Sequence, residues 1–365
     1  MLIKLLSVYL ILLLLGNPII SNKNNIFLYH DLINQASAYI ACYEYDKAQL
    51  KYQEAFQHNK EPFAIDIYNK MHVAIYSEDY QTMLECAKRL VSEKGLSLAA
   101  FEEAEGYRNF REQLEYWEKF KEWYPEGRET FLNSSNQEHI ALFRQVLEDD
   151  QKFRRHPERY TTYLPQNDSI DQVNAKIIKD YISVYGYPPE NRIGVLETNE
   201  RGKTAFMDFL MIVFRHYFGN FEKFDFDLRP VLIKAVKEGH LHPELLKMYL
   251  MQIKDMFPEY DKLIPGKTME ASVIHEISGQ VFIASYNKDL ITITDSYRKI
   301  FSLSNSYLLF KKAAFSALNL DLPFELFYTN RRSILNLAIP EQKDMFIEFL
   351  QLRPLIDGED YIHCN

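Results

Sequence analysis

Apolar residues recur every three or four positions along most of this chain, and this spacing is the strongest constraint on its fold. The pattern runs with few breaks from Ile26 to about Tyr124 and returns from Ile140 onward. A period near 3.6 residues places apolar side chains on one face of an α-helix. Gly 12 and Pro 14 are few for 365 residues, so little interrupts the helices. The sequence predicts a mainly α fold, and its length predicts two or three domains.

The first residues are typical of a secretory signal peptide. Lys4 precedes an apolar run over residues 5–15, and Gly16 and Pro18 then break the helical pattern. The run is shorter than the roughly 20 apolar residues that cross a bilayer. We therefore predict that residues 1–21 are cleaved and that the protein is exported, to the periplasm or outside the cell. An uncleaved membrane anchor is the alternative, and it would be the chain's only membrane contact.

Residues 22–132 carry a pattern of paired helices. Its two units are Tyr43–Ala48 with Tyr52 and Ala55, and Ser77–Met83 with Ala87 and Leu90. Met83 lies 35 positions after Ala48. Small and aromatic residues at these positions let antiparallel helices approach closely. The region resembles the tetratricopeptide repeat family, with a period of about 34 residues, which implies a helical hairpin array with a concave surface for a protein or peptide. Generic helical hairpins are the alternative.

A second predicted unit, an all-α domain over residues 137–262, follows a break at Asn133–Asn136. Its polar residues at helical spacing are Asp150, Gln151, Arg154, Asp171, Asn174 and His216. Asp150 and Arg154 share a helix face and can pair. His216 continues an apolar stripe, and an imidazole in an apolar setting can act as a general base or ligand. The candidate catalytic residues are His216, Asp150 and Arg154, and the candidate ligand-binding residues are Gln151 and Asn174.

Each of these positions also has a purely structural explanation. The charged run over residues 149–155 is typical of a solvated helix face. A histidine at the end of a helix also interacts favourably with the helix dipole. The spacing alone therefore leaves open whether the chain is an enzyme.

The order of these polar residues, continued by Gly186-Tyr187-Pro188 and Gly194, resembles an uncharacterised bacterial domain family. The family tends to have glutamine where this chain has Arg215, and small and acidic residues where it has Tyr217 and Phe218. These departures put in doubt any activity that the resemblance would imply. Gly186 itself is predicted to end a helix with a positive φ, because glycine adopts that conformation without steric cost.

After residue 265 the apolar period changes, which predicts a small α+β region over residues 265–365. Alternation at period two over residues 271–295 predicts three strands. A helix is expected at 297–318, a strand at Phe324–Tyr328 and a last helix at Glu341–Leu352.

Composition and motifs exclude several functions. A net charge of -9 offers no positive field for phosphates, so we expect no nucleic acid partner. His240, His242 and His275 lack an acidic residue at metal-ligand spacing, and the known nucleotide and hydrolase motifs are missing from the sequence. We expect no metal and no cofactor.

The cysteines give no framework either. Cys42, Cys86 and Cys364 are odd in number and widely spaced. We predict that Cys42 and Cys86 pack as small apolar residues in the repeat helices.

Two functions fit these observations. The first is an exported helical-repeat scaffold for a protein or peptide partner. The alternative is a hydrolase-like or small-ligand-binding protein with its site around His216.

Overall fold

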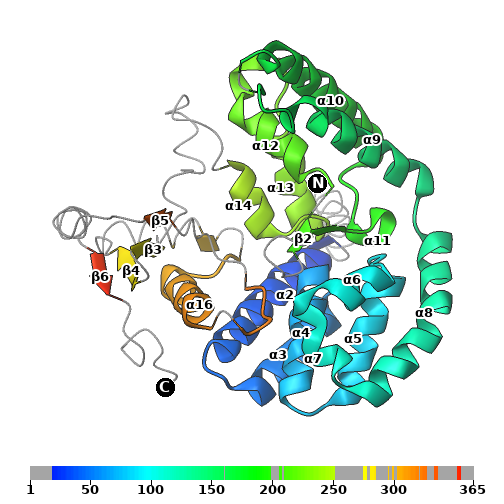
Figure 1. Ribbon diagram of the computed structural model, residues 1–365, viewed down its shortest axis with the longest axis vertical. Coiled ribbons are helices and arrows are strands. Elements are labelled where there is room, and N and C mark those ends of the chain that lie inside the picture. Colours follow the sequence, from blue (N-terminus) through cyan, green and yellow to red (C-terminus); the bar gives the residue numbers. More distant parts are fainter. Residues whose placement is uncertain are drawn as a thin grey trace, which may run out of the picture.

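The computed structural model describes two long stretches of the chain and several short segments. The described residues are 19–159, 161–198, 205–207, 209–250, 274–277, 280–284, 295, 298–299, 302–319, 321–326, 333–335 and 352–354. Most of the described residues are helical, which confirms the prediction of a mainly α protein. Figure 1 shows helices α2 to α8 in one half of the molecule and α9 to α14 in the other.

The N-terminal helices pack as antiparallel hairpins. Helix α2 (Ile19–Ile40) pairs with α3 (Tyr45–His58), α4 (Ala64–Tyr76) pairs with α5 (Tyr80–Ser92), and α8 (Leu114–Ser134) packs on α5. Short helices α6 (Leu98–Glu103), η1 (Glu105–Tyr107) and α7 (Arg108–Arg111) lie between α5 and α8 in the chain. We call α2 to α8 the hairpin array.

The turns inside the two hairpins have the same geometry. Tyr43 in the first turn and Glu78 in the second both adopt φ 57°, in the left-handed region. The backbone N–H of Glu44 donates to the Tyr39 carbonyl at 2.9 Å, and that of Asp79 donates to the Ala74 carbonyl at 2.8 Å. The equivalent positions in the two turns are separated by 35 residues, the same offset as in the sequence pattern.

The residues predicted to lie between paired helices are all fully buried. They are Ala48, Tyr52, Ala55, Met83, Ala87 and Leu90, each 0% exposed. Alanine at a helix contact lets the two backbones approach closely, and the larger side chains fill the space beside it. The hairpins are therefore held by packed apolar contacts.

The second group of helices surrounds its own apolar core. It contains α9 (Gln137–Arg154), α10 (Leu164–Tyr185), α11 (Glu190–Ile193), α12 (Met211–Gly219), η3 (Phe221–Lys223), α13 (Arg229–Glu238) and α14 (Pro243–Leu250). At the predicted break, α8 ends at Ser134, and the Asn136 side chain caps α9 by accepting from the His139 N–H at 3.0 Å.

The prediction that this group is entirely helical is wrong in one place. Strands β1 (Leu196–Thr198) and β2 (Ala205–Met207) form an antiparallel pair, and α12 begins only at Met211. The run from Ala205 to Phe218 is apolar nearly all round, a pattern that is typical of a single buried helix. A run that is apolar nearly all round has no clear period, so it did not separate a short strand from the helix that follows.

In the C-terminal region the structure describes one helix and four short strands. They are α16 (Ser306–Leu318), β3 (Ile274–Ile277), β4 (Gln280–Ala284), β5 (Ser333–Leu335) and β6 (Leu352–Pro354), with strand order β5-β3-β4-β6. Strands β3 and β4 are antiparallel with Ile277 opposite Gln280, β5 is parallel to β3, and β6 is antiparallel to β4. The α+β character of residues 265–365 stays a prediction, because most of them lie outside the described residues.

Two details of the C-terminal prediction are wrong. Phe324–Leu326 form no strand, because their backbone groups bond to a side chain of α4 and lie along a helix. Helix α16 begins at Ser306, nine residues later than expected, where the Asn305 side chain accepts from the Leu308 N–H at 2.8 Å. The predicted third strand and the predicted last helix lie outside the described residues, apart from Asp295 and Leu352 at their ends.

The prediction that Cys42 packs inside a repeat helix is also wrong. It lies half-buried in the turn between α2 and α3 and is disulfide-bonded, whereas Cys86 is free and buried, as predicted. The spacing of cysteines along a chain does not reveal which of them the fold brings together, so the odd count was a poor guide.

Two glycines with the same positive φ differ in whether a side chain would also meet a neighbour. Gly95 and Gly186 both have φ 75°, as predicted for Gly186. A Cβ on Gly95 would lie 2.5 Å from the Phe131 ring, whereas a Cβ on Gly186 would meet nothing within 4 Å. We expect Gly186→Ala to lower the free energy of unfolding by about 1–3 kcal/mol, because φ 75° with ψ -175° is a conformation that almost only glycine adopts. Gly95→Ala should cost a further 1–3 kcal/mol or so, because Phe131 must move. Equal losses in urea denaturation would contradict this packing explanation.

Candidate functional site

Three helices bring most of the predicted site residues together. We call Asp150, Gln151 and Arg154 of α9, Asp171 of α10 and His216 of α12 the His216 cluster. The Arg154 guanidinium bridges two carboxylates, with Nη1 3.2 Å from Asp150 Oδ1 and Nη2 2.6 Å from Asp171 Oδ1. The Gln151 amide donates to Asp150 Oδ2 at 2.6 Å. His216 Nε2 lies 3.7 Å from the same Asp150 oxygen.

The cluster is graded from a buried floor to an accessible rim. The side chain of Asp150 is 1% exposed and that of Asp171 is 7% exposed, whereas Arg154 is 15% and His216 26% exposed. The two carboxylates therefore lie beneath the arginine and the imidazole. A small solute could reach His216 without any unfolding of the helices.

Burial shifts the proton affinities in opposite directions. It raises the pKa of Asp150, and it raises that of Asp171 to about 6, with Arg154 opposing both shifts. Burial, together with the nearby charges of Arg154 and Arg215, lowers the pKa of His216 to about 4. The imidazole is therefore neutral at pH 7, and its proximity to Asp150 is not an ion pair there. A neutral imidazole beside carboxyl groups of raised pKa is an arrangement suited to proton transfer.

Two residues differ from their predicted roles. The Asn174 amide donates to the Val146 carbonyl at 3.1 Å and is 1% exposed, so it fastens α10 to α9 and is not placed to bind a ligand. Asp171 was part of the polar pattern but was not selected as a site residue. Asp171 lies one helical turn before Asn174, and this spacing could have identified it as a site residue.

Histidines elsewhere do not form a second site of the kind considered in the sequence. His240 and His242 flank the turn between α13 and α14, and His275 lies in β3. Within the described part of the chain, no three His, Cys, Asp or Glu side chains are grouped so as to hold a metal ion.

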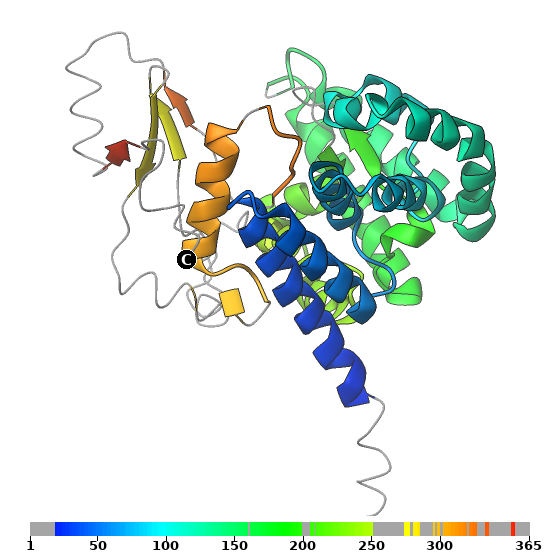
Figure 2. The ribbon, with the colours of Figure 1, turned by 90° about the horizontal axis from the view of Figure 1, so that it is seen from below.

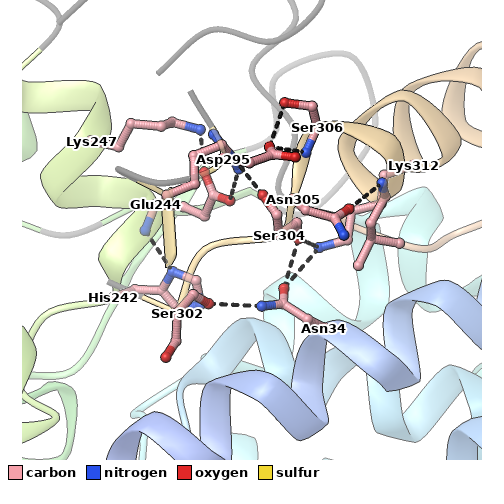
Figure 3. Close-up of polar contacts among 12 residues, drawn as sticks. Asn34, His242, Glu244, Lys247, Asp295, Ser302, Ser304, Asn305, Ser306 and Lys312 are labelled. Carbon is pink, nitrogen blue, oxygen red and sulfur yellow. Dashed lines mark hydrogen bonds and ion pairs between the residues drawn. The ribbon is translucent and has the colours of Figure 1, made fainter. Parts of the chain in front are cut away.

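A second polar region joins α2, α14 and residues 302–312, as Figure 3 shows. Glu244 of α14 accepts from Lys247 and from Arg298 Nη2, the latter at 3.3 Å. Burial alone would raise the pKa of Glu244, but Lys247 and Arg298 outweigh it and lower that pKa to about 2. Lys312 Nζ donates to Ser304 Oγ at 2.7 Å. We call these residues, with Asn34 and Ser302, the buried network.

The buried network fastens the C-terminal segment to the hairpin array. Asn34 of α2 donates to the Ser302 carbonyl at 2.7 Å and accepts from Ser304 Oγ at 2.7 Å. The adjoining cavity measures about 20 Å³. A cavity of this size holds a water molecule but no organic ligand. The network is therefore best explained as an interface between distant parts of the chain.

Beyond the network, residues 321–326 lie along α4. The Asn69 side chain pairs with both backbone groups of Glu325, donating to its carbonyl and accepting from its N–H, each at 2.9 Å. The Tyr68 hydroxyl donates to the Pro323 carbonyl at 2.9 Å. Phe324 is 4% exposed and its ring contacts those of Tyr45, His72, Tyr76 and Phe315. Figure 2 shows α16, which precedes this segment, beside α2.

Comparison with family models, with curated proteins and with solved structures found no match to this chain. The resemblances to the tetratricopeptide repeat family and to the uncharacterised bacterial domain stay predictions. Among the described helices, none is long and apolar enough to cross a bilayer.

The lowered pKa of His216 predicts a specific pH dependence of stability. A neutral folded-state imidazole contributes stability that is present above the unfolded pKa of about 6.5 and is lost as the pH falls toward about 4. This difference corresponds to about 3 kcal/mol at most. We expect His216→Gln, which cannot take up the proton, to lose less stability than the wild type between pH 7 and pH 4. Parallel curves of unfolding free energy against pH for the two chains would contradict the assignment.

Proposed function

We propose that the His216 cluster is a small-ligand site with the acid–base groups of a hydrolase. The observation that carries this proposal is the approach of a neutral, solvent-accessible imidazole to 3.7 Å from a buried carboxylate on another helix. The first expectation from the sequence, a scaffold with a free concave surface, is less well supported, because residues 321–326 cover α4. The His216 cluster, in contrast, has a side chain that solvent reaches, because His216 is 26% exposed.

The contacts suggest how each group would act. A small closure of the His216–Asp150 gap would let Nε2 donate to Asp150, leaving Nδ1 as the basic nitrogen toward a ligand. Nδ1 could then take a proton from water or from a hydroxyl group. The imidazolium formed in this way would return the proton to the leaving group, and the buried Asp171 would hold Arg154. Arg154 holds both carboxylates in place and is a positioning residue.

A substitution at His216 tests this proposal. We expect the wild-type chain to hydrolyse at least one member of a panel of chromogenic esters and phosphoesters. His216→Ala should lower kcat/KM by about 100-fold or more, the usual contribution of a general base. His240→Ala, at a half-buried histidine outside the cluster, is the matched control and should leave the rate unchanged.

A ligand screen covers the case of binding without turnover. Compounds that raise the melting temperature of the wild-type chain should not do so for His216→Ala. A wild-type chain that turns over no substrate and is stabilised by no compound would contradict the proposal, as would equal behaviour of the His216 and His240 variants.

A second candidate function is a scaffold for a protein or peptide partner, built on the hairpin array. Residues 321–326 favour it, because they form neither helix nor strand and bind α4 through backbone groups and one aromatic side chain. The repeated turn geometry at Tyr43 and Glu78 supports a tetratricopeptide-like arrangement. Since α4 is covered by the chain itself, a partner on that face must replace residues 321–326.

We propose further that the protein is exported. The disulfide of Cys42 supports this, because structural disulfides persist in oxidising compartments and are rare in the cytosol. Fractionation of the native host cells followed by mass spectrometry should find the chain outside the cytoplasm with its N-terminus near residue 22. A cytoplasmic chain with a free Cys42 thiol would contradict the proposal, and an exported chain that retains Met1 would indicate an anchor.

A further inference from the structure

We infer that the α4 face, formed by Tyr45 of α3 and by Tyr68, Asn69, His72 and Tyr76 of α4, is a binding site for a peptide segment that carries one aromatic residue. In the isolated chain the ligand of this site is its own segment, residues 321–326. The inference rests on the second candidate function and defines the chemistry of the partner. It is independent of the His216 cluster.

Backbone recognition at this face does not depend on the ligand's side chains. Asn69 is 3% exposed, and its amide pairs with both the N–H and the carbonyl of Glu325. Tyr68, which is fully buried, donates to the Pro323 carbonyl two residues earlier. These three hydrogen bonds fix the direction and register of the bound segment, and any peptide offers the same backbone groups.

Side-chain recognition falls on one position, that of Phe324. Its ring stacks on Tyr45 at 5.7 Å between centroids and contacts Tyr76 at 5.6 Å and His72 at 6.1 Å. Of its four aromatic neighbours among the described residues, three belong to the hairpin array and Phe315 belongs to the C-terminal segment. The site therefore selects an aromatic residue, whichever chain supplies it.

His72 indicates that Phe324 does not complete the site. The ring is 0% exposed, and neither of its nitrogens has a hydrogen-bond partner among the described residues. A buried polar group without a partner costs about 1–3 kcal/mol. An apolar ring such as phenylalanine would fill the position of His72 without this free-energy cost. Packing against residues 321–326 therefore does not explain why the residue is a histidine.

The contacts that hold residues 302–312 on α2 are separate from those that hold residues 321–326 on α4. Ser302, Ser304 and Lys312 are held separately on α2 by Asn34 of the buried network. A peptide with the same backbone and aromatic groups would restore the three hydrogen bonds and the ring contacts that the departing segment gives up. The exchange therefore involves little net loss of contact.

Fluorescence anisotropy with a labelled synthetic peptide of residues 319–328 tests the inference on the full chain. Phe324→Ala empties the aromatic position, so this variant should bind the peptide saturably. The wild-type chain should bind it at least about 10-fold more weakly, because its own segment competes. A peptide with alanine at position 324 should bind the Phe324→Ala chain about 10-fold more weakly than the unaltered peptide does. The double variant Asn69→Ala with Phe324→Ala should bind the unaltered peptide about 10-fold more weakly than Phe324→Ala does.

Absence of saturable binding by a cooperatively folded Phe324→Ala chain would overturn the inference. So would equal binding of the alanine-substituted peptide. If Phe324→Ala does not fold, Leu326→Ala, which removes a smaller buried side chain of the same segment, replaces it with the same expected outcomes. Failure of peptide binding while the wild-type chain still captures envelope proteins would overturn this specificity and leave the scaffold proposal standing.

Discussion

The burial of helix α4 on nearly every side is the constraint on which the rest of this structure depends. Ten of its residues are buried, from Ala64 to Ala74, and three of them, Asp66, Asn69 and His72, are polar. A buried polar group needs a partner, and a helix of 13 residues in the array cannot supply all of them. The Tyr29 hydroxyl of α2 donates to the Asp66 carboxylate, and the Asn69 amide donates to the Glu325 carbonyl. Segments far away in the chain are therefore required to complete the N-terminal hairpins.

The first turn of α4 is completed from the other half of the molecule. Glu190 of α11 accepts from the Ala64 N–H at 2.7 Å and from the buried Lys94 ammonium at 3.1 Å. A carboxylate at a helix N-terminus satisfies an otherwise unpaired N–H and interacts favourably with the helix dipole. The same side chain thus caps α4 and neutralises a cation that the array buries. Together with the buried network, this contact ties α4 to both later parts of the chain.

The features that could be predicted from the sequence depend on residues close together in the chain and on the spacing of apolar residues. The positions of Ala48, Tyr52 and Met83 between paired helices followed from helical spacing and a 35-residue offset, and the structure buries all three. The convergence of Asp150, Arg154 and His216 followed from one shared helix face and an apolar stripe. What could not be predicted depends on contacts between residues far apart in the chain. The pairing of Asn69 with Glu325 joins positions separated by 256 residues, and no periodicity records it. The short β1–β2 pair was missed because an apolar run suits both a buried helix and a strand.

The two candidate sites differ in how far the chain's own residues already occupy them. At the His216 cluster the internal contacts are made among the floor residues, since Arg154 binds Asp150 and Asp171, while the imidazole at the rim has no hydrogen bond to its neighbouring carboxylate at 3.7 Å. The His216 imidazole, which can act as a base or as a ligand, is therefore accessible to solvent. At the α4 face the backbone and aromatic positions are filled, and the His72 nitrogens are without hydrogen-bond partners in the part of the chain that the structure describes. A ligand at the first site adds contacts to a preformed cluster, whereas a ligand at the second must exchange with residues 321–326. The first should therefore bind its ligand in a single step, and the second should bind at a rate limited by release of the chain's own segment.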